Sequence, residues 1–113
     1  MNRIQTLFAA AKASGKKIFT AYLTMGFPDM KYSERAVETL IDNSVDIIEF
    51  GVPFSDPMAD GPVIRLAGQK ALAHGTKLQD ILDCIARLRV KYPETPFVLF
   101  SYYNVLFSRG LEA

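Results

Sequence analysis

Apolar residues that recur every three to four positions predict four amphipathic helices. The segments with this spacing are residues 2–14, 30–43, 63–73 and 76–92. Their ends carry ordinary helix signals. Gly15 follows the first helix, Asp29 can cap the second, and Thr76 with Gln79 forms a capping box at the start of the fourth. These signals separate the helices from segments with a different pattern.

Three short and almost continuously apolar runs predict β-strands between the helices. The runs are residues 18–25, 45–50 and 97–103. Strands that alternate with helices predict an α/β fold with parallel strands and right-handed crossovers. Two architectures remain open on this pattern, a doubly wound sheet and a (β/α)₈ barrel. A barrel needs eight strands and about 250 residues.

The composition allows one domain over residues 1–113 and excludes several classes of function. A formal net charge of +1 predicts no strong attraction to nucleic acid or to a membrane surface. With Cys84 as the single cysteine there is no internal disulfide, and no Cys/His cluster predicts a metal site. The N-terminus lacks the apolar core of a signal peptide, so a cytoplasmic protein is expected.

Glu49 stands out because it lies at the carboxyl end of the second predicted strand, just before Gly51. That end of the strands is where α/β proteins place their chemistry. A carboxyl group that loses hydration there is more readily neutral, which suits a group that gives and takes protons. A solvated glutamate, or one paired with an arginine, produces the same pattern, so position alone leaves both interpretations open.

The loop that follows, GVPFSDPMADGP, contains two further acidic residues, Asp56 and Asp60. Its three prolines restrict the backbone, and Gly51 and Gly61 permit unusual backbone angles. A loop of this kind can hold carboxylates in fixed positions. By composition alone, however, ordinary solvated loop residues explain either aspartate more simply.

Side chains alternate along a strand, so each predicted strand has two faces. One face of the first strand carries Thr20, Tyr22 and Thr24, and one face of the third carries Val98, Phe100, Tyr102 and Asn104. If these faces point to the same side as Glu49, they form an aromatic-lined pocket with a few polar groups, as is usual for a small-molecule site. For each aromatic residue singly, core packing is the simpler explanation.

The stretch EFGVPFSDPMADGPVI, residues 49–64, closely resembles the signature of tryptophan synthase α subunits. The region with Tyr22, Thr24, Gly26 and Pro28, the segment ALAHGTKLQDIL and the end SYYN of the third strand are also similar to that family. The resemblance runs over essentially the whole chain. It implies the N-terminal part of a (β/α)₈ TIM barrel, with about three βα units and a leading helix.

The resemblance also implies an activity, a lyase reaction in the last steps of L-tryptophan biosynthesis. Members of the family cleave indole-3-glycerol phosphate to indole and glyceraldehyde 3-phosphate by a retro-aldol reaction. The family's general acid/base falls on Glu49, and its second catalytic carboxylate falls on Asp60. The aromatic or aliphatic groups that surround the indole fall on Tyr22, Phe100 and Tyr102.

A partner is implied in the same way. In the family, the loop after the second strand docks on a β subunit within an α₂β₂ heterotetramer. The matching positions here are Pro53 and Asp56. Pyridoxal phosphate is expected in the β subunit, and no cofactor is expected in this chain.

Two other interpretations are a binding module that engages a β-type partner without turnover, and another phosphate-sugar barrel enzyme, which the SDPMADGP string disfavours. The family's phosphate-binding loops lie in the second half of the barrel. A polypeptide of these 113 residues is therefore expected neither to close a barrel nor to cleave the substrate. A third crossover helix is expected to start near Gly110, so Phe97, Leu99 and Tyr103 on the outer side of the third strand are expected to face water or another chain.

Overall fold

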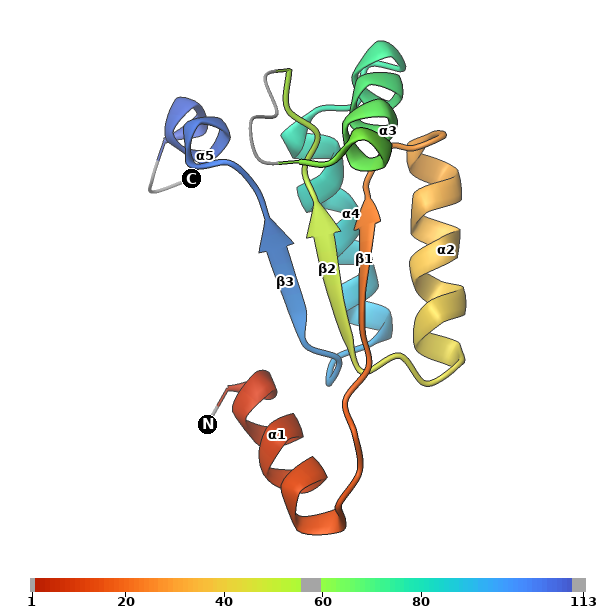
Figure 1. Ribbon diagram of the computed structural model, residues 1–113, viewed down its shortest axis with the longest axis vertical. Coiled ribbons are helices and arrows are strands. Elements are labelled where there is room, and N and C mark those ends of the chain that lie inside the picture. Colours follow the sequence, from red (N-terminus) through yellow and green to blue (C-terminus); the bar gives the residue numbers. More distant parts are fainter. Residues whose placement is uncertain (1, 56–59, 111–113) are drawn as a thin grey trace.

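The computed structural model describes residues 2–55 and 60–110. Within them the chain forms α1 (Arg3–Ser14), β1 (Thr20–Thr24), α2 (Met30–Asp42), β2 (Ile47–Gly51), α3 (Pro62–Ala73), α4 (Leu78–Lys91), β3 (Phe97–Phe100) and α5 (Tyr103–Arg109). Helices α2 and α4 cover one face of the sheet, α1 lies below its amino ends, and α3 and α5 lie at its carboxyl ends (Figure 1). None of the helices in the described residues is long and apolar enough to cross a membrane.

The three strands are parallel and lie in the order β1-β2-β3, as the alternation of strands and helices predicts. The register aligns Tyr22, Glu49 and Val98 in one row across the sheet. Two residues further toward the carboxyl ends of the strands, a second row aligns Thr24, Gly51 and Phe100. Because aligned residues of parallel strands share a face, both rows belong to one side of the sheet.

The opposite face of the sheet forms the core with α2 and α4. Phe50 is fully buried and packs edge-on against Phe97, with ring centroids 5.1 Å apart. The other members of this core are Met25, Val37, Ile48, Val52, Ile81, Cys84 and Leu88. Phe97 and Leu99 are half-buried against it, so the expectation that both face water or another chain is wrong. The helix before β3 covers its outer side, and Tyr103 is exposed on α5 instead.

Helix ends follow the sequence signals in two of three cases. Asp29 caps α2 by accepting a hydrogen bond from the Tyr32 amide at 2.8 Å. Gly15 ends α1 in the left-handed region, at φ 72°. The predicted capping box of Thr76 and Gln79 is wrong, because α4 begins at Leu78.

A tertiary contact explains the shift of the α4 start. The Thr76 side chain is buried against Gly26, where an added Cβ would lie 2.2 Å from the Thr76 hydroxyl oxygen. Lys77 takes the cap position, and its amide donates to a carboxylate oxygen of Asp80 at 2.9 Å. Gln79 instead donates to Asp83 along the helix. The local sequence fits a capping box at Thr76, but the contact of Thr76 with the β1–α2 loop holds this residue outside the helix.

Strand β3 is shorter than predicted. It ends at Phe100, where the Val52 amide donates to the Phe100 carbonyl at 2.9 Å. Tyr102 is the cap residue of α5, and Asn104 lies inside that helix. The almost continuously apolar run from residue 97 to 103 hides this change. The helix begins at Tyr103, and Val105 packs back onto the core, neither of which the strand pattern reveals.

Arg89 orders the segment that leads from α4 into β3. Its guanidinium donates to the carbonyls of Tyr92, Pro93 and Thr95 at 3.1, 3.2 and 2.7 Å. It also lies over the ring of Phe97, 4.2 Å from the centroid. Together these contacts satisfy the carbonyls of the C-cap residue and of the connecting segment, and set the start of β3 against the core.

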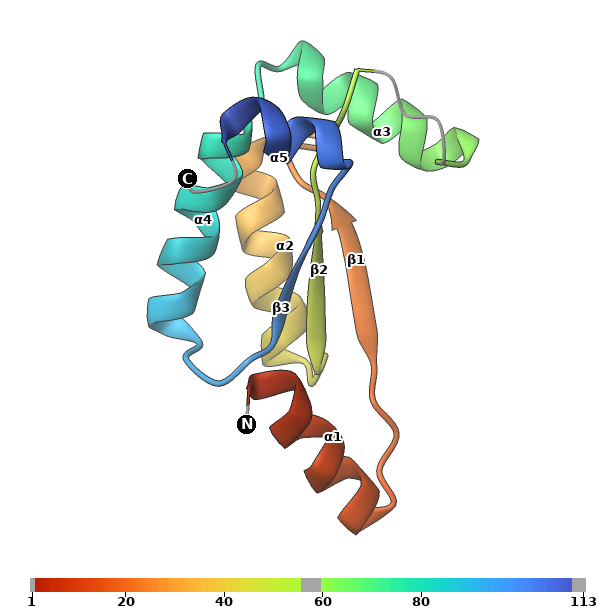
Figure 2. The ribbon, with the colours of Figure 1, turned by 90° about the vertical axis from the view of Figure 1, so that its left-hand side faces the viewer.

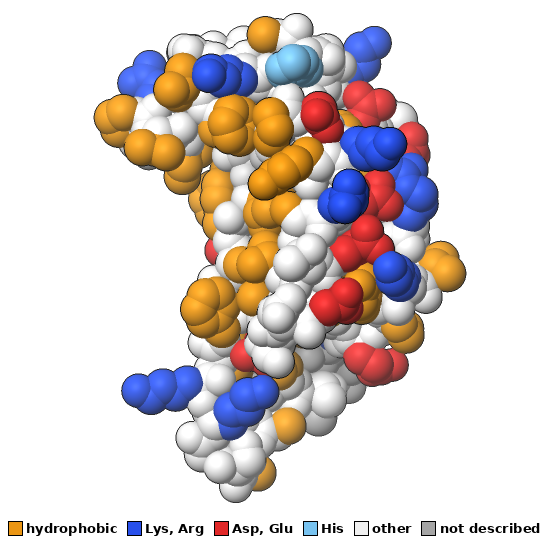
Figure 3. Space-filling model, turned by 90° about the vertical axis from the view of Figure 1, so that its right-hand side faces the viewer, with side chains coloured by type: hydrophobic (Ala, Val, Ile, Leu, Met, Phe, Trp, Pro, Cys, Tyr) orange, Lys and Arg blue, Asp and Glu red, His pale blue; other side chains and the backbone are white. Residues whose placement is uncertain are grey.

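Charged and hydrophobic side chains gather on opposite sides of the molecule. Three polar pairs join α2 to α4: Glu34 with Arg87, Glu38 with Lys91, and Asp42 with Tyr92. Exposed pairs of this kind add little stability each. The opposite side is hollowed and carries mainly hydrophobic side chains (Figure 3). This hollowed side is the open face of the sheet.

Candidate functional site

The open face of the sheet brings together three of the residues singled out from the sequence. Glu49 lies on the middle strand beside Tyr22 of β1, and Phe100 of β3 lies two rows nearer the carboxyl ends. The helices α2 and α4 lie on the other side of the sheet, while α3 extends over the carboxyl end of the open side (Figure 2). These three residues therefore share one face of the sheet, as the predicted arrangement requires.

Tyr22 is the centre of this arrangement. Its ring meets that of Phe100 edge-on, with centroids 5.5 Å apart and an interplanar angle of 85°. Its hydroxyl end lies against Gly51, where an added Cβ would be only 2.1 Å from the hydroxyl oxygen. Glycine at position 51 is therefore what leaves room for the phenol on the sheet.

Both candidate carboxylates contribute to the electrostatic surroundings of Tyr22. Burial raises the pKa of Tyr22, and a hydrogen-bond interaction with Thr24 opposes the shift. Repulsion from the Asp60 and Glu49 carboxylates, and then from Tyr102, raises this pKa further. Glu49 and Asp60, which are 11 positions apart in the sequence, thus act on one phenol group.

Asp60 reaches the site from the loop before α3. Gly61 caps that helix in an extended conformation, and Pro62 occupies its first turn. Proline at this position needs no hydrogen bond from its nitrogen, so the helix starts at Pro62, two residues after Asp60. A small pocket beside it is lined by Tyr22, Thr24, Val52, Pro53, Phe54, Asp60, Ile64, Arg65 and Gly68. The start of α3 therefore sets where the Asp60 carboxylate can lie.

Phe54 and Tyr102 extend the aromatic lining, although neither lies on a strand. Their ring centroids are 5.2 Å apart. Sequence reasoning missed Phe54, whose signal is its place between Pro53 and the acidic part of the loop. Pro53 is half-buried against α3, and Asp56 lies outside the described residues.

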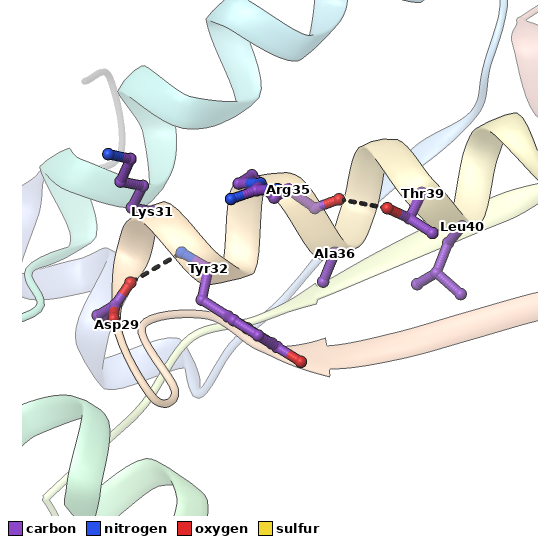
Figure 4. A pocket seen from close by; sticks show the side chains of 7 residues that line it. All are labelled: Asp29, Lys31, Tyr32, Arg35, Ala36, Thr39 and Leu40. Atoms are coloured by element: carbon purple, nitrogen blue, oxygen red, sulfur yellow. Dashed lines mark hydrogen bonds between the residues drawn. The ribbon is translucent and has the colours of Figure 1, made fainter.

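A larger hollow, of about 710 Å³, lies on the outer surface of α2 and has no part in this arrangement. Its lining is drawn in Figure 4. Its polar groups serve the helix itself: Asp29 accepts from the Tyr32 amide, and the Thr39 hydroxyl donates to the Arg35 carbonyl. No residue of the open sheet face lines it.

The described residues contain no group of three or more His, Cys, Asp or Glu side chains that could hold a metal ion. Cys84 is buried between α2 and α4, and burial raises its pKa to about 12. Its thiol is therefore protonated at neutral pH and is no nucleophile.

Comparison with known proteins agrees with this geometry. The family model for the tryptophan synthase alpha chain matches residues 8–113. The alpha chain of Aquifex aeolicus is 42% identical over 112 residues, which are 99% of this chain and 43% of the relative. That of Geobacter sulfurreducens is 45% identical over 112 residues, 99% of this chain and 42% of the relative. This chain thus spans less than half the length of these relatives.

Solved structures show the same fold. A structure from Aquifex aeolicus superposes with a TM-score of 0.95 at 42% identity, over 99% of this chain and 44% of that one. Tryptophan synthase subunit alpha from Legionella pneumophila superposes with a TM-score of 0.94 at 38% identity, over 97% of this chain and 42% of that one. The aminoacrylate-bound tryptophan synthase of M. tuberculosis superposes with a TM-score of 0.92 at 31% identity, over 99% of this chain and 45% of that one.

These likenesses decide between the two architectures that the sequence left open. The three parallel strands and their helices are part of a TIM barrel, not of a doubly wound sheet. The open side of the sheet, with Tyr22, Glu49 and Phe100, is then the side that faces the barrel axis. The chain belongs to the tryptophan synthase alpha chain family.

Proposed function

We propose that this segment supplies the acid/base groups with which a tryptophan synthase α chain cleaves indole-3-glycerol phosphate to indole and glyceraldehyde 3-phosphate. The observation that carries the proposal is the placement of Glu49 and Asp60 around Tyr22 at the carboxyl end of the open sheet face. TIM-barrel enzymes place their active sites at that end. Membership of the family supports the same reaction.

Glu49 is proposed to move both protons of the retro-aldol reaction. As an acid it protonates the indole ring at C3, and the carboxylate that remains takes the proton of the glycerol hydroxyl. The electron pair of that O–H bond forms the aldehyde, and the carbon–carbon bond electrons return to the ring. Glu49 ends protonated, as it began. Its half-buried place on the middle strand supports this double role, because a carboxyl group held by the sheet can serve both transfers from one position.

Asp60 is proposed to stabilise the positive charge that the ring nitrogen acquires when C3 is protonated. A fixed carboxylate at this place acts mainly in the transition state, where the charge develops. The aromatic groups Tyr22, Phe100 and Tyr102 are proposed to pack against the indole. The edge-on contact of Tyr22 with Phe100 supports this role, because it forms an apolar surface on the open sheet face.

Asp60→Asn tests the electrostatic role, and should be made in a complete α chain. By this we mean a polypeptide of family length that contains these 113 residues and is completed by the remaining sequence of the Aquifex aeolicus relative. The substitution keeps the shape and removes the charge. We expect kcat for cleavage to fall on the order of 100-fold, with KM nearly unchanged, because the charge acts in the transition state.

Steady-state kinetics on indole-3-glycerol phosphate measure both constants. The matched control is Asp83→Asn, at an exposed position on α4 where the side-chain oxygen still accepts from Gln79. A change confined to KM in the Asp60 variant would mean that Asp60 only holds the substrate.

A β subunit is the proposed partner, in an α₂β₂ assembly whose pyridoxal phosphate belongs to β. The likeness to the M. tuberculosis tryptophan synthase structure supports such a partner. The docking surface is proposed to include Pro53 and Asp56 of the loop after β2. In a complete α chain, Asp56→Ala is expected to weaken activation by β roughly 10-fold, as for loss of one charged interface contact, with a smaller effect on α alone.

Cleavage rates measured with and without added β subunit check this expectation. The control is Asp83→Ala, which removes a carboxylate from the opposite, outer side of the molecule. Equal losses in the presence and absence of β would count against docking through Asp56.

A further inference from the structure

We propose that Gly51 is a positioning residue of the site, which acts through Tyr22 on the surface that receives the indole ring of the substrate. Because Gly51 has no side chain, it leaves a gap in one row of the open sheet face, and the phenol of Tyr22 fills this gap. The inference rests on the function proposed above. Three observations carry it: the place of the gap, the fixed position of the strand around it, and the direction in which the phenol is free to move.

The gap follows from the register of the sheet. Tyr22 is aligned with Glu49, whereas Gly51 is aligned with Thr24 on one side and with Phe100 on the other. The phenol reaches forward from its own row to Gly51. An added Cβ at position 51 would lie 2.1 Å from the hydroxyl oxygen of Tyr22, 2.4 Å from Cζ and 2.7 Å from Cε2. Any side chain at position 51 must therefore displace either the phenol or the backbone.

The backbone at Gly51 is held on both sides. Its carbonyl accepts a hydrogen bond from the Met25 amide at 2.9 Å, and the amide of the next residue, Val52, donates to the Phe100 carbonyl, also at 2.9 Å. Phe50 and Val52, the neighbours of Gly51 in the sequence, are buried in the core. A shift of the strand would break these hydrogen bonds and disturb a close-packed interior, which is costly. The displacement therefore falls on the phenol.

The free direction for the phenol is away from the sheet. Thr24 and Phe100 flank Gly51 in its row, and the ring of Phe100 already meets that of Tyr22 edge-on, with centroids 5.5 Å apart. What remains is rotation into the hollowed side of the molecule (Figure 3). The indole ring is proposed to pack in this space. A side chain at position 51 would therefore push the phenol into the place of the substrate.

The functional consequence is a steric control of substrate binding. Gly51 keeps the phenol close to the sheet, and Tyr22 in turn leaves room for the indole ring. The carboxylate of Glu49 lies in another row and keeps its proposed role in proton transfer. Since packing against the indole is present in the ground state and in the transition state alike, its loss should raise KM more than it lowers kcat.

The test is a double-mutant cycle of Gly51→Ala and Tyr22→Leu in a complete α chain, with kcat and KM for indole-3-glycerol phosphate cleavage measured for all four proteins. Gly51→Ala alone is expected to raise KM roughly 10-fold, as for one carbon too many in an apolar pocket, with kcat nearly unchanged. Leucine lacks the three atoms that clash. In the Tyr22→Leu background, Gly51→Ala should therefore change KM by less than about twofold.

Two further variants separate the steric effect from a general loss of stability. Tyr22→Phe retains Cζ and Cε2, which also clash, so it is expected not to relieve the effect of Gly51→Ala. Gly15→Ala, at the end of α1, adds a Cβ that meets nothing within 4 Å, at a residue with φ 72°. It is expected to lower the unfolding temperature, because alanine is strained at positive φ, and to leave both kinetic constants unchanged.

The outcomes separate this inference from the proposed function. An unchanged KM in a folded Gly51→Ala protein, or an equal rise of KM in the Tyr22→Leu background, would overturn the inference while leaving the proposed function intact. If Gly51→Ala alone does not fold, Tyr22→Leu must restore a cooperative thermal transition, and failure of that rescue would also overturn the inference. A complete α chain that folds but cleaves nothing would overturn both.

Discussion

In a complete α chain, Glu49→Gln is expected to lower the rate of indole-3-glycerol phosphate cleavage by at least about 100-fold. Glutamine has the shape of a protonated glutamate but can neither release nor take up the proton. Among the carboxylates of the described strands, Glu49 alone lies on the open face, in the row between Tyr22 and Val98. The substitution therefore removes the group that is proposed to carry out both proton transfers of the reaction.

The measurement is the steady-state rate of cleavage, with circular dichroism to show that the variant folds. Glu94→Gln is the matched control, because Glu94 is an exposed residue of the segment before β3, at the other end of the sheet. Retention of the wild-type rate by a folded Glu49→Gln protein would remove Glu49 from its proposed role.

A polypeptide consisting only of residues 1–113 is expected to show no measurable cleavage and to be marginally stable or self-associated. Its open sheet face would lie in water, with Phe100 50% exposed. Phe8 of α1 and Phe19 before β1 are 53% and 62% exposed, which adds to the uncovered apolar surface. Strands β1 and β3 also leave free edges in the described structure. Such surfaces and edges promote association.

Catalysis by this polypeptide fails for a separate reason. Glu49 and Asp60 are both present, but they lie on one side of an open surface, with little to hold the substrate against them. Positioning supplies a large part of enzymatic rate enhancement. Sedimentation and thermal unfolding test the first half of the expectation, and an assay against the Glu49→Gln form of the same polypeptide tests the second. A monomer with a sharp cooperative transition, or cleavage above that control, would contradict it.

The sequence could predict the helices and strands because each has a characteristic spacing of apolar residues. It could also predict that Glu49 lies in the second strand near its carboxyl end, although that strand includes Gly51 and runs from Ile47 to Gly51. Alternation along the strands grouped Tyr22 with Thr24, and Val98 with Phe100, each on one face. The structure confirms that these faces are shared with Glu49.

Spacing failed where a tertiary contact competes with a local signal. Thr76 matched a capping box, but its burial against Gly26 moves the start of α4 to Leu78. Tyr102 continued an apolar run, but the chain leaves the sheet after Phe100, so Tyr102 meets Phe54 from outside the strand. The start of α4 and the position of Tyr102 both depend on contacts with segments that are distant in the sequence, so a local pattern does not reveal them.

By itself, then, the sequence determined which elements form, because hydrophobic period and turn residues act within a few positions along the chain. It also determined the family, through the long and unusual string around Glu49 and Asp60. Only the tertiary structure decided which face of the sheet is open, that α4 covers the outer side of β3, and that Tyr22 reaches across to Gly51. These features depend on the register between strands and on the packing of one side chain into the space left by another, and both are set when the whole sheet assembles.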